Sequence, residues 1–194
     1  MITACASSCR GPQGEAAQGP PPRITTPPAA DHSPGEWKEF SSRQGRFTIL
    51  FPVAPEEEDH AYDTPSGRLD SREYRSSEDA ADYAVDYRDY QIDLEADAET
   101  LNYVMDRLRD AGTSYFNGRV LSESEVSLGG HPGRALKVGI AEGIIWVRMY
   151  AVGRRLYQVA VTTRGEQSAP GAGRADEARA MKFLDSFRLL APED

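Results

Sequence analysis

The sequence predicts an α+β protein, a layered sandwich in which a central, mostly antiparallel sheet of six to seven strands is flanked by helices. Three observations lead to this fold class. Short β-prone runs separated by tight joints recur along the chain, and in two places the spacing of apolar residues changes from a period of two to a period of about 3.6. One run, Ile144–Val152, is apolar on both faces apart from Arg148, which is typical of a strand covered on both sides.

The first half of the folded part is predicted to form three strands. RFTILFP (Arg46–Pro52) is a short apolar run that ends at proline, and further β-prone runs follow at Gly67–Ser77 and Asp82–Tyr90. The acidic stretch PEEEDHAYDTPSG (residues 55–67) is interpreted as a solvated loop between the first two strands. We expect the three strands to form an antiparallel meander.

A helix is predicted after these strands, in the segment DAETLNYVMDRLRDAG. Asp97 is placed as its N-cap and Gly112 as its C-terminal stop. A helix with one apolar side is expected to cover one face of the sheet. Four apolar residues recur with helical spacing: Leu101, Val104, Met105 and Leu108.

Four more strands are predicted in the second half, because the tight joints Gly129-Gly130 and Gly153-Arg154 favour hairpins. The stretch GEQSAPGAG (residues 165–173) is expected to be an exposed, mobile loop. A second helix follows, with an apolar stripe of Ala180, Phe183, Leu184 and Phe187. The four strands are RVLSESEVSL (Arg119–Leu128), GRALKVGIA (Gly133–Ala141), IIWVRMYAVG (Ile144–Gly153) and RRLYQVAVTT (Arg154–Thr163).

Composition predicts where the folded part begins and ends. Proline and glycine dominate between Gly11 and Gly35, where Ile24 is the only aliphatic residue larger than alanine, so no buried face can form. We therefore expect residues 1–35 to be a disordered tail and linker. Residues 36–190 are expected to form one domain that starts near Trp37, and residues 191–194 a short tail.

The charge of the chain disfavours one class of partner. Acidic residues number 31 and basic residues 22, for a net charge of −9. The first 35 residues hold two of each sign, so the whole excess lies in the folded part. A field of this sign repels phosphate backbones, and we expect no nucleic-acid partner.

Five stretches share a common texture of strands and turns: GRFTILFP, YAVDY, LGGHPGRALKV, RMYAVGRRLYQVAV and KFLDSFRLL. Together they resemble a group of bacterial proteins with the PsbP-like fold, which the PsbP extrinsic subunit of photosystem II shares with eukaryotic Ran-binding import factors. The resemblance covers Trp37 to Leu190. It implies a central antiparallel sheet flanked by helices and used for docking to partners rather than for chemistry, but no functional residue of those families can be carried over.

Arg148 is the main candidate binding residue, since it shares a strand face with Trp146 and Tyr150. A buried guanidinium needs a carboxylate or an aromatic face, and either arrangement is common in ligand pockets. The alternative is that Arg148 lies near a sheet margin with its stem packed and its head in water. Strand tyrosines such as Tyr87 and Tyr157 are expected to pack in the core.

The sequence offers little support for metal or cofactor chemistry. Glu56–His60 gathers carboxylates but lacks the alternating spacing and glycine of a dedicated calcium loop, so no metal is expected. His131 is the one histidine placed where a folded scaffold could hold it, and it is interpreted as a turn residue. No phosphate-binding or dinucleotide-binding motif occurs, and no cofactor is expected.

The N-terminal stretch Ile2-Thr3-Ala4-Cys5 has the pattern of a bacterial lipobox, in which Cys5 would carry the lipid. A Pro/Gly tether and a compact domain follow, which is the order of parts in a lipoprotein. The apolar signal segment would then lie upstream of Met1. The alternative interpretation is a chance match in a tail rich in small residues.

The leading hypothesis is a non-catalytic binding or assembly module of the cell envelope, on the periplasmic or other extracytoplasmic face. It would bind a protein or another envelope component and touch the membrane only through a lipid on Cys5. Without that lipid the chain would be a cytoplasmic module. Two alternatives remain open: a carrier of a small ligand between the sheet and the helix Asp97–Ala111, and a hydrolase with a sheet-edge site built on Arg148 and a carboxylate, for which the sequence supplies no nucleophile–base pair.

Overall fold

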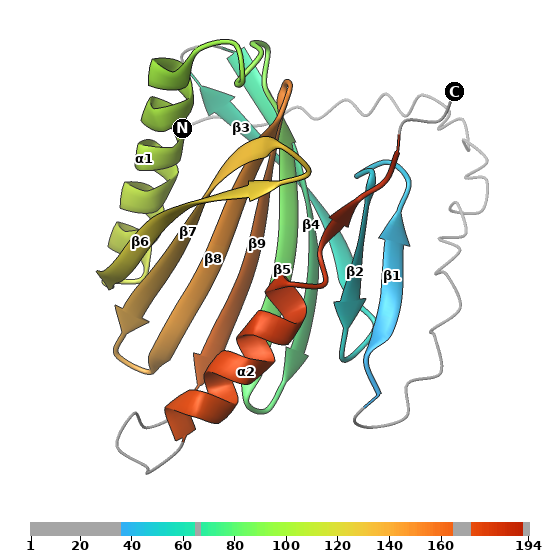
Figure 1. Cartoon of the computed structure of the whole chain (residues 1–194), viewed down its shortest axis with the longest axis vertical. Coiled ribbons are helices and arrows are strands. Elements are labelled where there is room, and N and C mark those ends of the chain that lie inside the picture. The colour runs from blue at the N-terminus through green and yellow to red at the C-terminus, as the bar shows by residue number, and fades with distance from the viewer. Residues whose placement is uncertain (1–35, 65–66, 165–171, 192–194) are drawn as a thin grey trace, which may run out of the picture.

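The computed structural model describes residues 36–64, 67–164 and 172–191, which form two sheets and two helices (Figure 1). The predicted tail 1–35, with Cys5, and most of the predicted loop 165–173 lie outside the described residues. The elements are β1 (Lys38–Ser42), β2 (Phe47–Phe51), β3 (Glu56–Thr64), β4 (Gly67–Glu78), β5 (Ala81–Asp89), α1 (Ala98–Tyr115), β6 (Arg119–Leu128), β7 (His131–Ile140), β8 (Gly143–Val152), β9 (Arg155–Arg164), α2 (Ala172–Leu184) and β10 (Arg188–Leu189).

The large sheet has seven strands in the order β3-β4-β5-β9-β8-β7-β6, and every neighbouring pair is antiparallel. This confirms the predicted α+β class. The glycines of the hairpin joints adopt positive φ angles, 60° at Gly129, 92° at Gly130 and 58° at Gly153, as tight turns require. Strand β8 lies between β7 and β9, so the run that is apolar on both faces is a central strand.

Each face of the large sheet buries a separate hydrophobic cluster. Alternate residues of β8 divide between them, since Trp146 and Tyr150 belong to one cluster and Ile145 and Met149 to the other. Helix α1 covers the Met149 face with Leu101, Met105 and their neighbours. Helix α2 and a small sheet cover the Tyr150 face; Figure 1 shows α1 to the left of the large sheet and the small sheet to the right. The protein is therefore layered on both sides of one sheet.

The small sheet has the order β1-β2-β10 and packs through aromatic rings. Phe47 is completely buried, and its ring centroid lies 5.6 Å from that of Tyr74, 6.3 Å from Tyr157 and 5.4 Å from Phe187. The hydroxyl of Tyr157 donates to the carbonyl oxygen of Gly45, in the turn between β1 and β2, at 2.7 Å. Apolar burial and a buried hydrogen bond therefore fix the small sheet on the large one.

The acidic stretch predicted to be a loop is instead strand β3, at the edge of the large sheet. The interpretation as a loop was wrong because the charges of β3 are compensated by arginines of β4. Arg72, directly opposite Asp59, contacts both Asp59 at 2.6 Å and Glu57 at 2.8 Å. Charged side chains also suit an edge strand, because they discourage pairing with other chains. The predicted meander therefore begins at β3, and β2 belongs to the other sheet.

Helix α1 has the predicted start but not the predicted end. The carboxylate of Asp97 accepts hydrogen bonds from the backbone N–H of Glu99 and Thr100, as an N-cap should. The helix continues past Gly112 to Tyr115. Asn117 has a φ of 48° and turns the chain, so the left-handed residue that ends the helix is an asparagine and the predicted glycine stop is wrong.

The second helix ends at Leu184, so Phe187 does not extend its apolar stripe as predicted. The hydroxyl of Ser186 accepts from the backbone N–H of Leu50 and donates to the carbonyl of Phe183, which turns the chain toward β2. Leu189 then pairs with Phe47 in the small sheet. The helix therefore ends before Phe187, and the chain pairs with the open edge of β2. Phe187 nevertheless remains buried, at 1% exposure.

We predict that Phe187→Ala lowers the free energy of unfolding by about 3 to 5 kcal/mol, because it opens a cavity at the contact between both sheets. The ring of Phe187 lies parallel to that of Tyr150, with centroids 6.1 Å apart. Chemical denaturation measures the effect. Phe116→Ala is the control, since that ring is 47% exposed and its loss should change stability little. A loss below about 1 kcal/mol for Phe187→Ala would contradict the packing described here.

Candidate functional site

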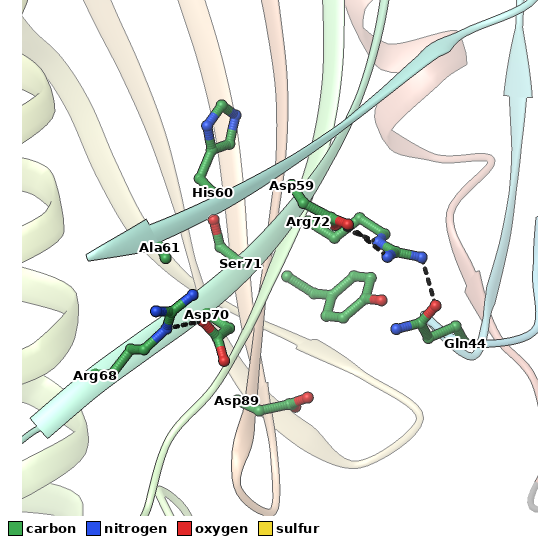
Figure 2. Close-up of a pocket in the computed structure, with 10 residues that line it drawn as sticks. Gln44, Asp59, His60, Ala61, Arg68, Asp70, Ser71, Arg72 and Asp89 are labelled. Atoms are coloured by element: carbon green, nitrogen blue, oxygen red, sulfur yellow. Dashed lines mark hydrogen bonds and ion pairs between the residues drawn. The ribbon is translucent and has the colours of Figure 1, made fainter. Parts of the chain in front are cut away.

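A polar cavity of about 360 Å³ lies where β3, β4 and β5 extend past the turn between β1 and β2 (Figure 2). This volume is within the range of small-molecule sites, about 300 to 1,000 Å³. The lining residues are Gln44, Asp59, His60, Ala61, Arg68, Asp70, Ser71, Arg72, Tyr87 and Asp89. We refer to this cavity as the cleft.

Strand alternation places most side chains of the cleft on one face of the sheet. Asp59 lies opposite Arg72 in the register, and Arg72 lies opposite Tyr87, so these three form a row across three strands. Tyr87 in turn lies opposite Tyr157. His60 and Ser71 are a register pair with the other parity, and in Figure 2 the His60 side chain extends away from Arg72. The row that begins in the cleft therefore continues under the small sheet.

Arg72 and Asp59 form a bidentate ion pair in the cleft. Nε and Nη2 of Arg72 donate to the two carboxylate oxygens of Asp59 at 2.6 Å and 2.8 Å. These hydrogen bonds lower the pKa of Asp59 and raise the pKa of Arg72, so both groups stay charged. Nη1 of Arg72 also donates to the side-chain oxygen of Gln44. The guanidinium thus joins β3 to the turn before β2.

Asp89 and Arg155 form a second bidentate pair, with both hydrogen bonds at 2.6 Å. Nη1 of Arg155 also donates to the backbone carbonyl of Gln44 at 2.8 Å. Its guanidinium carbon lies 4.3 Å from the ring centroid of Tyr87, which is a cation–π contact. Arg155 therefore holds Asp89, the turn and one face of the Tyr87 ring in place.

The charges that line the cleft cancel almost completely. A third pair, Nε of Arg68 to Oδ1 of Asp70 at 2.8 Å, lies at the rim and is well exposed. The three carboxylates of Asp59, Asp70 and Asp89 are thus matched by three guanidinium groups. Arg68 and Arg72 belong to the lining, whereas Arg155 approaches it through Asp89, so each lining carboxylate has a guanidinium partner. The lining is rich in hydrogen-bonding groups.

The hydroxyl of Tyr87 lacks a hydrogen-bond partner among the described residues, although it is buried. The residue is 4% exposed, and burial raises its pKa to about 12, so the phenol is protonated at neutral pH. Leaving a buried hydroxyl unpaired costs about 1 to 3 kcal/mol. The cleft therefore contains one donor and acceptor that the described part of the protein does not satisfy.

The turn between β1 and β2 forms one wall of the cleft, and its shape is specified locally. The hydroxyl of Ser42 accepts from the backbone N–H of Gly45 at 2.9 Å, and Arg46 takes a positive φ of 56°. A Cβ at Gly45 would lie 2.5 Å from the Phe47 ring, so glycine is needed for the close approach. Tyr157, Arg155 and the Ser42 hydroxyl thus hold this wall in position.

Arg148, predicted as a binding residue, lies on β8 away from the cleft. Its Nη2 donates to Oδ1 of Asp185, in the segment after α2, at 2.6 Å, and lies 3.6 Å from the sulfur of Met181. The Arg148 side chain is 20% exposed. The guanidinium therefore has a carboxylate partner, as expected for a buried arginine. This ion pair links β8 to the end of α2.

Trp146 and Tyr150 are both buried on the same face as Arg148. Nζ of Lys137 lies 4.1 Å from the centroid of the Trp146 ring, and the Trp146 indole N–H has no partner among the described residues. Tyr150 stacks on Phe187 and lies opposite Tyr157 in the register. Tyr150 is thus on the same cross-strand row as Tyr87, at the end that the small sheet and Phe187 cover.

A second group of ionisable residues lies on the other face of the β3–β4 pair. Nε2 of His60 is 3.6 Å from Glu58 and 3.4 Å from Glu73, and one potential metal-ligating atom from each of the three lies within 4.8 Å of the others. Glu73 also accepts from Nε of Arg75 at 2.8 Å. Glu73 is therefore shared between His60 and Arg75.

His131 begins strand β7, directly after the predicted turn. Its Nδ1 lies 2.9 Å from Oε1 of Glu95, and Oε2 of Glu95 accepts from the backbone N–H of Gly153 at 2.5 Å. Glu95 therefore joins two hairpins of the sheet to the segment that precedes α1, which is a structural role. The space between α1 and the sheet, where a carried ligand was one hypothesis, is filled by the cluster around Met105 and Met149.

Sequence reasoning missed the cleft because its residues come from three separate segments. A signal for part of it was present: Arg68, Asp70 and Arg72 alternate on β4, and β3 carries acidic residues at the complementary positions. That pattern would have identified the hairpin. Nothing in the sequence around Tyr87 indicates that its hydroxyl lacks a partner, because this depends on how much of the large sheet the small sheet covers.

The comparisons with known proteins bear on the fold. No protein-family model and no curated protein matches this chain. The solution structure of cyanobacterial PsbP (CyanoP) from Synechocystis sp. PCC 6803 superposes with a TM-score of 0.55 at 12% identity, over 79% of this chain and 92% of that one. A crystal structure of a protein of unknown function from Pseudomonas aeruginosa matches at 12% identity over 82% and 99% of the two chains, with a TM-score of 0.35. The resemblance found in the sequence is confirmed at the level of the fold: the chain has the PsbP-like α+β fold.

Proposed function

We propose that this protein is a non-catalytic binding module and that the cleft is its binding site. The observation that carries the proposal concerns Tyr87. This residue lines the cleft, and its hydroxyl is buried and has no hydrogen-bond partner among the described residues. A bound molecule that hydrogen-bonds to it would remove an energetic cost that the empty protein bears. Binding sites commonly combine a preformed cavity with a few convergent polar groups of this kind.

The lining supports binding rather than catalysis. Its carboxylates are each held by an arginine at 2.6 to 2.8 Å. The lowered pKa of Asp59 makes that group unsuited to proton transfer near neutral pH. The hydroxyl of Tyr87 contacts no general base among the described residues, and its raised pKa makes it a poor nucleophile. These groups can orient a ligand by hydrogen bonds while leaving its covalent structure unchanged.

Nuclear magnetic resonance of the ¹⁵N-labelled protein tests the proposal. The probes are a neutral sugar, a primary amine, a carboxylate, inorganic phosphate and a fatty acid, each titrated separately. We expect at least one probe to shift the amide resonances of Gln44, Asp59, Tyr87 and Asp89, with little effect on those of Arg148 and Asp185. The bound probe should be recovered chemically unchanged after prolonged incubation.

Two results would reject this assignment. If no probe shifts the cleft resonances, the cleft is not a binding site for small molecules of these classes. If the shifts instead gather around Arg148, Trp146 and Tyr150, the binding residues first inferred from the sequence are the correct ones. Conversion of a probe would contradict the non-catalytic part of the proposal.

Attachment to the cell envelope through Cys5 is the second part of the proposal. The support is the lipobox pattern at residues 2–5 and the Pro/Gly-rich stretch that follows it. Neither helix in the described ranges has the length and apolar character needed to cross a bilayer. A lipid on Cys5 would hold the binding module at an extracytoplasmic membrane face, since each buried methylene contributes about 0.8 kcal/mol to membrane affinity.

If the native reading frame extends upstream, we predict that the extension encodes one or two basic residues followed by an apolar run of about 7 to 15 residues that ends at Ile2. In the extended protein, Cys5→Ala should abolish acylation and processing, whereas the matched control Cys9→Ala should change neither. Intact mass after detergent extraction from the native host measures both. An unacylated extended protein in the soluble fraction would remove the envelope assignment.

The unpaired hydroxyl also predicts an unusual effect on stability. Tyr87→Phe should raise the free energy of unfolding of the empty protein by about 1 kcal/mol, because it removes a buried polar group that has no partner. Tyr157 lies directly opposite Tyr87, and its hydroxyl donates to Gly45 at 2.7 Å. Tyr157→Phe, the matched variant, should therefore lower the free energy of unfolding by about 1 to 3 kcal/mol.

Urea denaturation of the two variants and the wild type decides this prediction. The two substitutions remove the same atom from neighbouring positions, so they should differ only in whether that atom is used inside the protein. A loss of stability in Tyr87→Phe comparable to that in Tyr157→Phe would mean that the Tyr87 hydroxyl is already satisfied within the protein, and would remove the main support for the cleft.

A further inference from the structure

We propose that the cleft binds a neutral saccharide, with one sugar ring seated against Tyr87 and Arg72; this inference rests on the proposed binding function and specifies its ligand. The first argument is the balance of charge. Every carboxylate of the lining that the structure describes is paired with a guanidinium group, at Asp59–Arg72, Asp89–Arg155 and Asp70–Arg68.

A ligand with a net charge would disturb this balance. A ligand carboxylate that reaches Arg72 must compete with Asp59, and it also approaches the carboxylates of Asp70 and Asp89. A ligand ammonium group that reaches one of the carboxylates must compete with its arginine, and it is repelled by the nearby guanidinium groups. Replacing either member of a bidentate pair leaves its former partner uncompensated, which costs more than the new contact returns. A ligand without charge leaves all three pairs intact.

The second argument is the hydrogen-bonding capacity that remains after the ion pairs are made. Each carboxylate oxygen has more than one lone-pair site, so Asp59 and Asp89 can still accept while they are held by arginine. Gln44 contributes an amide, and Tyr87 contributes a hydroxyl that can donate or accept. Sugar hydroxyls also donate and accept at once, and they occur on adjacent carbons, so a sugar ring can satisfy several of these groups together.

The residue types of the lining disfavour apolar ligands. Among the lining residues only Ala61 has a purely apolar side chain, and one face of the Tyr87 ring is already occupied by Arg155 at 4.3 Å. A fatty chain or an aromatic compound would bury the polar groups of the cleft without replacing their hydrogen bonds to water, which is unfavourable. The lining therefore selects for a ligand that is both uncharged and polar.

The shape of the cleft indicates how a longer glycan would lie. Exposure increases from the floor to the rim: Tyr87 is 4% exposed and the Arg72 side chain 22%, whereas the Arg68 and Asp70 side chains are 68% and 74% exposed. A cavity of about 360 Å³ is at the small end of ligand sites. One ring would occupy the floor, and further rings would extend past the Arg68–Asp70 pair into solvent.

The test compares sugars that share one ring and differ only in charge. Glucose is neutral, glucosamine carries an ammonium group at a pH where its amine is protonated, and glucuronate carries a carboxylate. Each is titrated into the ¹⁵N-labelled protein, followed by maltose and diacetylchitobiose to separate plain from N-acetylated glycans. We expect a neutral sugar to shift the resonances of Gln44, Asp59 and Tyr87 at concentrations at least about tenfold lower than its charged analogues, a difference of about 1.4 kcal/mol.

Matched variants separate the role of the hydroxyl from that of the fold. Tyr87→Phe should weaken binding of the neutral sugar by about three- to tenfold, because it removes one hydrogen bond to an uncharged group. Tyr62→Phe is the control, since Tyr62 is 47% exposed on β3 and its parity places it on the opposite face of the strand. This variant should bind the sugar as the wild type does.

Each alternative result has a distinct meaning. If a charged sugar, an amine or phosphate binds in the cleft as tightly as any neutral sugar, the saccharide assignment is wrong and the binding function stands. If neutral sugars bind equally well to wild type and Tyr87→Phe, the ring does not rest on Tyr87 and the inference fails. If no probe of any class binds in the cleft, both the inference and the proposed function fail.

Discussion

Phe47 of β2 lies between the two sheets, where its ring meets Tyr74 and Tyr157 of the large sheet and Phe187 of the segment after α2. The neighbouring hydrogen bond from Tyr157 to Gly45 fixes the turn between β1 and β2. Most other features of this face follow from that contact. The chain turns after α2 and pairs β10 with β2, and the small sheet packs against the aromatic side chains of the large sheet in one buried cluster.

The cleft exists because that cover is incomplete. The row Asp59–Arg72–Tyr87–Tyr157–Tyr150 crosses five strands on one face, and the small sheet with Phe187 covers only its last part. Where the cover stops, ion pairs replace aromatic packing, and Arg72 and Arg155 both reach Gln44 in the turn. Tyr87 lies at this boundary, and its buried hydroxyl has no hydrogen-bond partner among the described residues. The same contact between the two sheets therefore determines both the packing of the aromatic residues and the position of the cleft.

Local patterns in the sequence predicted what depends on neighbouring residues. The α+β class, the hairpin glycines, the N-cap Asp97 and the central position of β8 are of this kind. The predictions that were wrong concern elements whose structure depends on residues far away in the sequence. The acidic segment of β3 has the pattern of a loop, because the residue that compensates Glu57 and Asp59 is Arg72 on the next strand. Phe187 fits the spacing of the second helix, because nothing in the neighbouring sequence shows that the chain will pair with the open edge of β2. The sequence predicts that a buried Arg148 needs a carboxylate or an aromatic partner, but it does not identify Asp185 as that partner.

A crystal structure of the protein soaked with a neutral disaccharide tests the central claim most directly, since it locates the ligand and the Tyr87 hydroxyl together. The account predicts a sugar ring in the cleft, with an oxygen atom about 2.7 to 3.0 Å from that hydroxyl and the Asp59–Arg72 and Asp89–Arg155 pairs unbroken. A structure in which the Tyr87 hydroxyl bonds to a protein group, with the turn at Gln44 closed over the cleft and no sugar bound there, would contradict it.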